Sequence, residues 1–100
     1  MRRVDVVIRE EATLDLQEIY DAIADKSQSV AVARTFVDRI LARCSKIGDA
    51  PRGGRPRDDL RPGLRSVPFE KSALILYRVT DVVEIVNVFP CGRDYESLFR

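Results

Sequence analysis

Residues 30–48, VAVARTFVDRILARCSKIG, carry the clearest structural signal in the chain. Gly48 stands where a glycine often ends a helix, and Pro51 prevents the helix from continuing. Either Ser27 or Ser29 is suited to cap the amino end. The segment therefore predicts an amphipathic helix, because its apolar residues recur at the spacing of one helical face: Val30, Ala33, Phe36, Val37, Ile40, Leu41, Cys44 and Ile47.

A second amphipathic helix is predicted just before this one. Its apolar face is made by Ala12, Leu16, Ile19, Tyr20 and Ile23. From residue 10 to residue 25 there are six acids and no basic residue, whereas the exposed side of the later helix is basic. Because so few residues join the two segments, the helices must run antiparallel and form a hairpin.

Strand-like segments lie on both sides of this helical hairpin. One covers residues 4–8, and three more cover residues 64–69, 73–79 and 82–89. Only Thr80 and Asp81 separate the last two, which predicts a tight turn between them. The final strand has apolar residues at both odd and even positions, so both of its faces are apolar, as is typical of an interior strand. The order β-α-α-β-β-β predicts a single α+β domain over residues 1–100, with the helical hairpin packed on a small, mostly antiparallel sheet.

The composition narrows the classes of function. One hundred residues, 45% apolar and 33% charged, describe an ordinary globular domain. No apolar run approaches the roughly 20 residues that cross a bilayer, so we expect a cytoplasmic protein with no membrane partner. The chain has no histidine and only two cysteines, without metal-ligand spacing, so we expect no metal and no cofactor. Cys44 falls on the apolar stripe as a core residue, and Cys91 has no catalytic base beside it.

The net charge of +1 hides one basic patch. Between Pro51 and Arg65 five arginines stand against Asp58 and Asp59. Adjacent carboxylates in a loop usually cap a turn or pair with nearby arginines, so we expect a structural role for them. The pair Gly53-Gly54 lacks the lysine and the strand–loop–helix context of a nucleotide site. The overall balance is not that of a nucleic-acid-binding protein, and we expect no sequence-specific DNA binding by this chain alone.

Residues 53–66, GGRPRDDLRPGLRS, make the chain recognisable, since they resemble the GR-x-R-D-D-L-x-PGLRS segment of ParE toxins. Tyr77-Arg78-Val79 followed by VEIV at residues 83–86 resembles the next two strands of that family, and Gly92-Arg93-Asp94 with Leu98-Phe99 resembles its usual ending. The helical segment that begins at Ala12 and includes Asp15, Leu16 and Ile19 also fits. One departure is the stretch Phe89-Pro90-Cys91-Gly92, where many relatives carry a histidine, and this departure bears on potency.

The resemblance implies a RelE-like fold and a role as the toxin of a type II toxin–antitoxin system. The implied partner is a cognate, ParD-like antitoxin, whose flexible C-terminal segment wraps the toxin and whose N-terminal part binds DNA. The implied target is DNA gyrase, inhibited by binding, with no catalytic residues. We expect a monomer or weak dimer in the free state and a hetero-oligomer with antitoxin.

Two other functions remain open. RelE-like cousins of ParE cleave messenger RNA on the ribosome, for which the working set here is Arg65, Arg78, Arg93 and Tyr95. The three arginines sit on adjacent segments, so we expect them either to converge on the sheet or to pair with Glu84, Asp58 or an acidic partner segment. Without histidine, the chain offers few groups for the acid–base steps of a nuclease. The third possibility is a non-toxic module that only binds antitoxin and serves transcriptional control.

Two surfaces are predicted for the partners. The antitoxin is expected to contact apolar residues that a small domain leaves uncovered, together with arginines that attract an acidic tail: Leu14, Arg55, Arg57, Arg61, Arg65, Val67, Phe69 and Arg78. The target is expected to contact the tail, at Arg93, Tyr95, Leu98 and Phe99.

Overall fold

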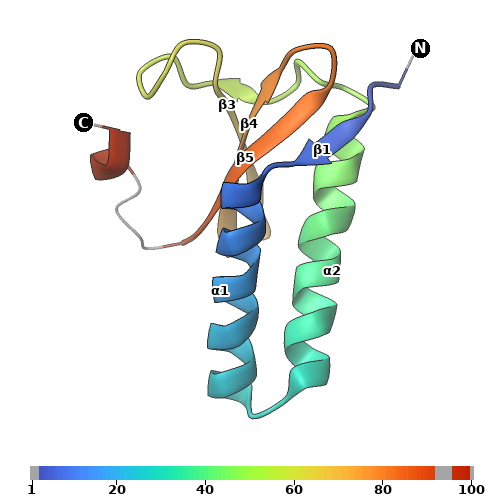
Figure 1. The fold of residues 1–100 in the computed structure, drawn as a ribbon, viewed down its shortest axis with the longest axis vertical. Helices are drawn as coiled ribbons and strands as arrows, with labels where there is room; N and C mark the ends of the chain where they lie inside the picture. Colours follow the sequence, from blue (N-terminus) through green and yellow to red (C-terminus); the bar gives the residue numbers. More distant parts are fainter. Residues whose placement is uncertain (1–2, 92–95, 100) are drawn as a thin grey trace.

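The computed structural model describes residues 3–91 and 96–99 (Figure 1). Its elements are β1 (Val6–Ile8), α1 (Glu10–Ser27), α2 (Val30–Ile47), β2 (Arg55–Pro56), β3 (Arg65–Phe69), β4 (Ala73–Val79), β5 (Val83–Pro90) and the 3-10 helix η1 (Glu96–Phe99). The predicted order β-α-α-β-β-β is confirmed, with β2 and η1 as additions that are too short for a periodic signal.

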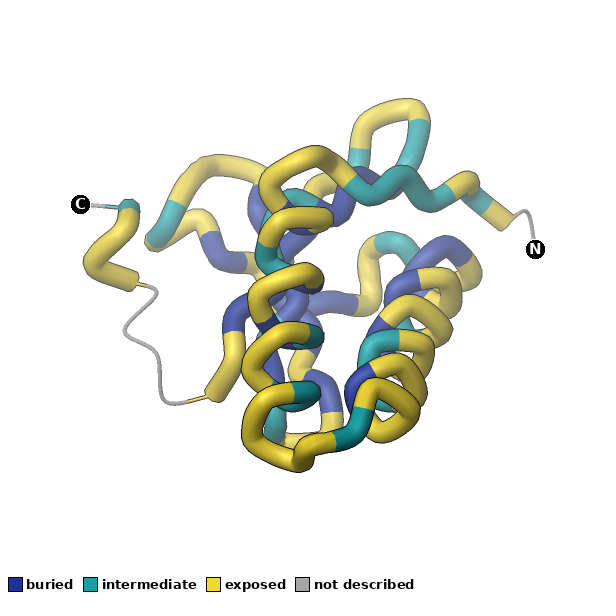
Figure 2. The backbone as a smooth tube through the Cα atoms, turned by 60° about the horizontal axis from the view of Figure 1, so that its bottom comes forward, coloured by how far each residue is buried: buried dark blue, intermediate teal, exposed yellow. Residues whose placement is uncertain are grey.

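One five-stranded sheet carries the helical hairpin. Its strand order is β1-β5-β4-β3-β2, with β1 parallel to β5 and every other pair antiparallel. The sheet is therefore mostly antiparallel, as predicted, and β5 is an interior strand between β1 and β4. Figure 1 shows α1 and α2 running side by side, and Figure 2 shows that the buried positions gather where the helices and the strands face one another.

The ends of α2 explain its boundaries. The Ser29 side chain accepts a hydrogen bond from the Val32 amide at 3.1 Å, so Ser29 is the N-cap. The hydroxyl of Ser27 instead donates back to the carbonyl of Ile23 at 2.6 Å. Gly48 has φ −61°, so a left-handed turn is not its reason for being glycine. A Cβ there would overlap the Val4 carbonyl oxygen, and the Val4 amide donates to the Gly48 carbonyl at 2.9 Å. Close approach of the chain before β1 is what requires glycine.

The prediction that Val67 and Phe69 are left uncovered is wrong, because both lie in the core. Val67 and Phe69 are only 5% and 4% exposed, so they are not left uncovered. They occupy alternate positions of β3 and therefore point to one face of the sheet, toward the helices. Phe69 meets Phe36 of α2 edge to face, with ring centroids 5.6 Å apart. Leu14, in contrast, is 57% exposed, as expected.

Cys44 lies in the same core, as its place on the apolar stripe predicted. Burial raises the pKa of its thiol to about 11, which keeps it protonated and unreactive at neutral pH.

Candidate functional site

Tyr77 holds the arginine-rich connection between α2 and β3 against the sheet. It is fully buried, and its hydroxyl donates to the Pro51 carbonyl at 2.8 Å and accepts from the Gly54 amide at 2.9 Å. Gly54 has to be glycine because a Cβ would collide with the Tyr77 ring and hydroxyl. Within the glycine pair, Gly54 thus forms part of the contact that fixes the connection to Tyr77.

The acids of this connection are structural, as expected. Asp58 accepts from the Gly63 amide at 2.9 Å, which closes a turn. Asp59 receives the Arg57 guanidinium at 3.0 Å on each carboxylate oxygen, and this hydrogen bonding lowers the pKa of Asp59. Arg57 is only 7% exposed and also reaches Glu96 at 3.4 Å. An antitoxin contact through Arg57 would have to compete with these internal bonds.

The tail is docked on the same connection. The Arg61 guanidinium lies 5.1 Å from the centroid of the Phe99 ring, a cation–π arrangement, next to the Arg57–Glu96 pair. Leu98 remains 54% exposed. The other two residues predicted to contact the target, Arg93 and Tyr95, lie outside the described residues. Two residues of the predicted target surface are described, and of these Leu98 is exposed whereas Phe99 is partly buried.

Arg65 and Arg78 do not converge, and this part of the prediction is wrong. Arg65 is directly opposite Tyr77 in the β3–β4 register, so both side chains share one face of the sheet. Arg78 follows Tyr77 in β4 and therefore points to the other face. Arg65 donates to the carbonyls of Arg52 and Gly54 at 3.0 and 2.8 Å, and so supports the connection.

Arg78 instead belongs to a charged cluster around Glu84 of β5. The Glu84 carboxylate accepts from Arg78 at 3.1 Å, from Arg9 at 2.8 Å and from the Thr80 hydroxyl at 3.0 Å. Hydrogen bonds from Arg78, then Arg9 and Thr80, lower the pKa of Glu84 to about 2. Sequence reasoning named Glu84 as a partner of the arginines but missed Arg9, which lies 75 positions away. Arg9 directly follows β1, and its contact with Glu84 depends on the pairing of β1 with β5, which no local pattern in the sequence reveals.

A polar pocket lies next to this cluster. Its volume is about 390 Å³, and its lining includes three arginines, two acids and the Phe99 ring: Arg9, Arg61, Arg78, Glu10 and Glu11. Across the described residues, the carboxyl pKa shifts of Asp59, Glu70 and Glu84 are all downward, and that of the Cys44 thiol is upward.

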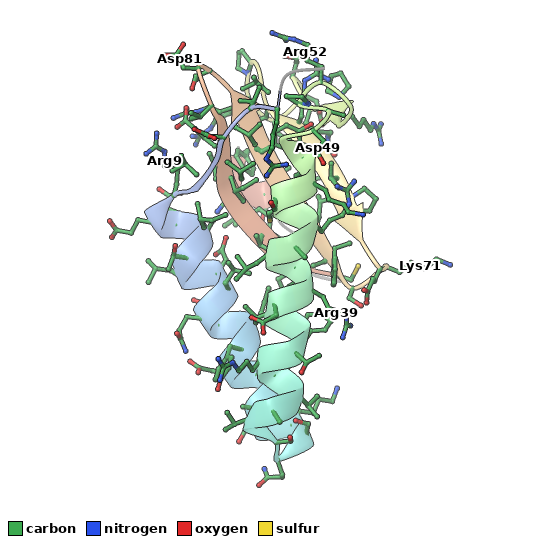
Figure 3. The ribbon with its side chains drawn as sticks, turned by 90° about the vertical axis from the view of Figure 1, so that its right-hand side faces the viewer. Arg9, Arg39, Asp49, Arg52, Lys71 and Asp81 are labelled. Carbon is green, nitrogen blue, oxygen red and sulfur yellow. The ribbon has the colours of Figure 1, made fainter. Side chains whose placement is uncertain are left out.

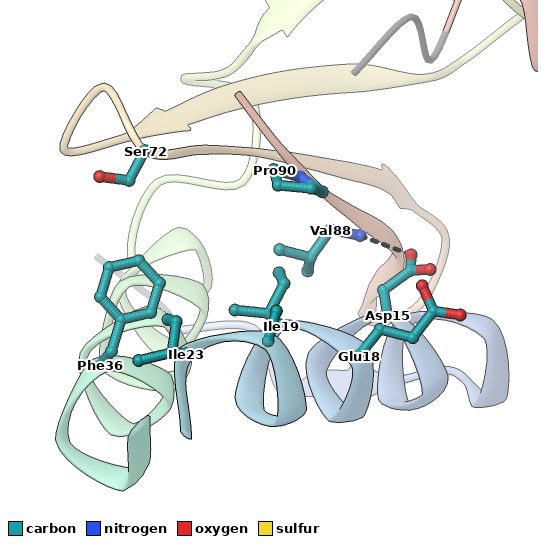
Figure 4. A pocket seen from close by; sticks show the side chains of 9 residues that line it. Asp15, Glu18, Ile19, Ile23, Phe36, Ser72, Val88 and Pro90 are labelled. Carbon is teal, nitrogen blue, oxygen red and sulfur yellow. Dashed lines mark hydrogen bonds between the residues drawn. The ribbon is translucent and has the colours of Figure 1, made fainter. Parts of the chain in front are cut away.

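An apolar pocket opens between the two helices and the ends of β4 and β5 (Figure 4). Its volume is about 360 Å³, and its apolar lining is Ile19, Ala22, Ile23, Phe36, Val88 and Pro90. Asp15 and Glu18 stand at one end. Asp15 is held in place, because its carboxylate accepts from the Val88 amide at 2.9 Å and from the Asn87 side chain at 3.1 Å. The exposed Leu14 lies one helical turn before Glu18 on α1, outside the lining of the pocket.

Neither α1 nor α2 is long and apolar enough to cross a membrane; this holds for the residues that the structure describes. Within the same residues, no three cysteine or carboxylate side chains come together as ligands for a metal ion would.

Comparison with known proteins places the chain in a family. The model of the family described as "ParE toxin of type II toxin-antitoxin system, parDE" matches residues 6–95. A chain of a solved structure, described as the chromosomal ParDE TA system from P. aeruginosa, has a similar fold, with a TM-score of 0.76 and 20% sequence identity over 88% of this chain and 96% of that chain. A comparison with curated proteins found no match. Since the family model covers almost the whole domain, this chain belongs to the ParE toxin family of type II toxin–antitoxin systems.

Proposed function

We propose that this toxin inhibits DNA gyrase by binding to it, without covalent chemistry, and that a ParD-like antitoxin neutralises it. Membership of the ParE family supports gyrase as the target. The binding mechanism is supported by the internal bonds of the arginines and by their positions on the sheet. Arg57, Arg65 and Arg78 are each bonded to groups of this chain, and Arg65 and Arg78 lie on opposite faces of the sheet. Under this proposal the protein acts in the cytoplasm, where gyrase works.

The same observation disfavours a ribosome-dependent nuclease. Such an enzyme needs a group to remove a proton from the 2′-hydroxyl, a group to protonate the leaving oxygen, and cations on one phosphate. Two of its four candidate residues, Arg65 and Arg78, project from opposite faces of the sheet, which disfavours joint contact with one phosphate. A module that binds antitoxin without being toxic is the third alternative. Assays of gyrase inhibition, messenger RNA cleavage and antitoxin binding separate the three.

The antitoxin is proposed to anchor an apolar side chain in the apolar pocket. The pocket has the volume of a small ligand site and is open to solvent. Leu14, which is exposed on the same helix, remains a proposed apolar contact. Arg55, Arg61 and Arg78 are exposed and remain proposed contacts for acidic residues of the wrapping segment. Leu98 and Phe99 remain proposed contacts for gyrase.

The direct test compares two activities of the purified protein. We expect inhibition of gyrase supercoiling, with accumulation of cleaved DNA, and no cleavage of messenger RNA on ribosomes. Codon-dependent cleavage with supercoiling unchanged would refute the proposal in favour of the nuclease. Inactivity in both assays, together with tight antitoxin binding, would refute it in favour of the regulatory module.

The antitoxin surface is tested with Ala22→Phe, which fills the apolar pocket from the exposed side of α1. We expect weaker antitoxin affinity and unchanged gyrase inhibition. Ala31→Phe is the matched control, since Ala31 is also an exposed helical alanine and does not line this pocket. Equal affinities of the two variants would place the antitoxin elsewhere.

A further inference from the structure

A basic groove runs between α2 and β3, apart from the apolar pocket and the polar pocket. Its volume is about 420 Å³, and it is lined by Arg39, Ala42, Arg43, Lys46, Pro68, Phe69 and Glu70. The three basic residues lie within about 60° of one another around α2, at 100° per residue. They therefore form one charged face beside the sheet edge. In Figure 3, Arg39 and Lys71 project from one side of the molecule and Arg9 from the other.

The groove already holds one carboxylate, which comes from the chain itself. Glu70 accepts two hydrogen bonds from Arg39, at 2.9 and 3.1 Å, in the two-pronged geometry that guanidinium and carboxylate groups prefer. This bonding to Arg39 lowers the pKa of Glu70. Both side chains are about half exposed, at 47% and 48%, so solvent and a competing ligand can reach the pair.

The remaining positive charge of the groove is not neutralised. Among the residues that the structure describes, neither Arg43 nor Lys46 has an acidic partner within ion-pair distance. Three cations against Glu70 leave a local excess of positive charge. Such a surface attracts a partner with several negative groups.

The sheet edge in the groove argues against strand addition as the way of binding. The Leu64 carbonyl and Ser66 of β3 face outward to the segment containing β2, and alternation gives Pro68 the same outward position. Proline has no amide hydrogen to donate, so it protects this edge from pairing with another strand. A ligand must therefore be held by side chains, and the side chains offered are cationic.

We propose that the basic groove docks an acidic segment of a partner protein, whose carboxylates bind Arg43 and Lys46 and displace Glu70 from Arg39. The turn that carries Glu70 fits such an exchange. Glu70 and Lys71 both have positive φ, 45° and 59°, a conformation that non-glycine residues seldom adopt. Release of Glu70 from Arg39 leaves this exposed turn free to adjust. The inference goes beyond the proposed function, because it concerns another surface and holds whether or not gyrase is the target.

The test uses a fluorescein-labelled peptide of alternating glutamate and alanine, with binding followed by fluorescence anisotropy at low salt. We expect the double variant Arg43→Gln with Lys46→Gln to bind about fivefold or more weakly, given what exposed ion pairs contribute. Its control is Arg34→Gln with Arg52→Gln, which removes the same charge. Arg34 lies half a helical turn around α2 from Arg43, and neither control residue lines the groove.

Displacement is tested by removing the internal carboxylate. Glu70→Gln frees Arg39 and is expected to tighten peptide binding severalfold. Asp81→Asn makes the same change in charge at the distant β4–β5 turn, and it should change the affinity much less. Circular dichroism melting curves establish that each variant is folded.

Two results would overturn the proposal. If both arginine-containing double variants weaken binding equally, or Glu70→Gln behaves like Asp81→Asn, the peptide responds to net charge and not to the groove. If a labelled DNA duplex binds more tightly than the peptide and shows the same dependence on Arg43 and Lys46, the groove serves nucleic acid instead.

Discussion

Replacing Tyr77 by phenylalanine should loosen the whole connection that carries the basic patch. The hydroxyl is the only group removed, and it is buried with two bonds, one to Pro51 and one to Gly54. A typical intramolecular hydrogen bond contributes about 1 kcal/mol, and a buried group left without a partner costs about 1–3 kcal/mol. We therefore expect Tyr77→Phe to lower the free energy of unfolding by about 2 kcal/mol.

The corresponding change in melting temperature is large enough to measure. For a domain of this length the entropy of unfolding is about 0.2 kcal/mol/K, so the loss corresponds to about 10 °C. The assay is thermal unfolding followed by circular dichroism and calorimetry. Tyr20→Phe is the matched control, because Tyr20 is only half-buried and the structure assigns no hydrogen bond to its hydroxyl. Gly54→Ala should destabilise the protein as well, through collision with the same ring.

A Tyr77→Phe variant that melts within about 2 °C of the wild type would contradict this prediction. That result would mean that water or a backbone shift satisfies Pro51 and Gly54 without the hydroxyl. A loss equal to that of Tyr20→Phe would lead to the same conclusion, since it would show that the position of the hydroxyl is immaterial.

Three further predictions concern pH, backbone strain and thiol reactivity. Because the folded pKa of Glu84 is about 2, below its ordinary 4.5, its contribution to stability is present above pH 4.5 and is lost as the pH falls through 2. Glu84→Gln should thus flatten the acid dependence of the melting temperature in that window; an unchanged slope would contradict the assignment. Lys71 has φ 59°, so Lys71→Gly should raise stability by about 0.5 kcal/mol in chemical denaturation, and a loss would show that the turn is not strained. With a thiol reagent at pH 8, the exposed Cys91 should react at once and the buried Cys44 only on unfolding; two rapid equivalents would refute this burial.

The local pattern of the sequence predicted the parts of this fold that depend on nearby residues. The apolar period placed α2 at the bounds that the structure has, and the short spacing between the helices predicted their antiparallel hairpin. The span 73–79 was likewise correct for β4. These features follow from backbone periodicity and turn chemistry, which are encoded within a few residues. Family resemblance supplied the type of toxin, because a motif such as the one at residues 53–66 can be read without any structure.

Contacts between distant segments were decided only by the tertiary structure. Which face a strand residue occupies depends on register, and register buried Val67 and Phe69 and put Arg65 and Arg78 on opposite faces of the sheet. The pairing of Arg9 with Glu84 needs β1 beside β5, which no local pattern reveals. The apolar pocket and the basic groove each take their walls from a helix and a strand far apart in the chain. Surfaces of this kind exist only once the helices pack on the sheet, because packing determines which apolar and charged side chains remain exposed.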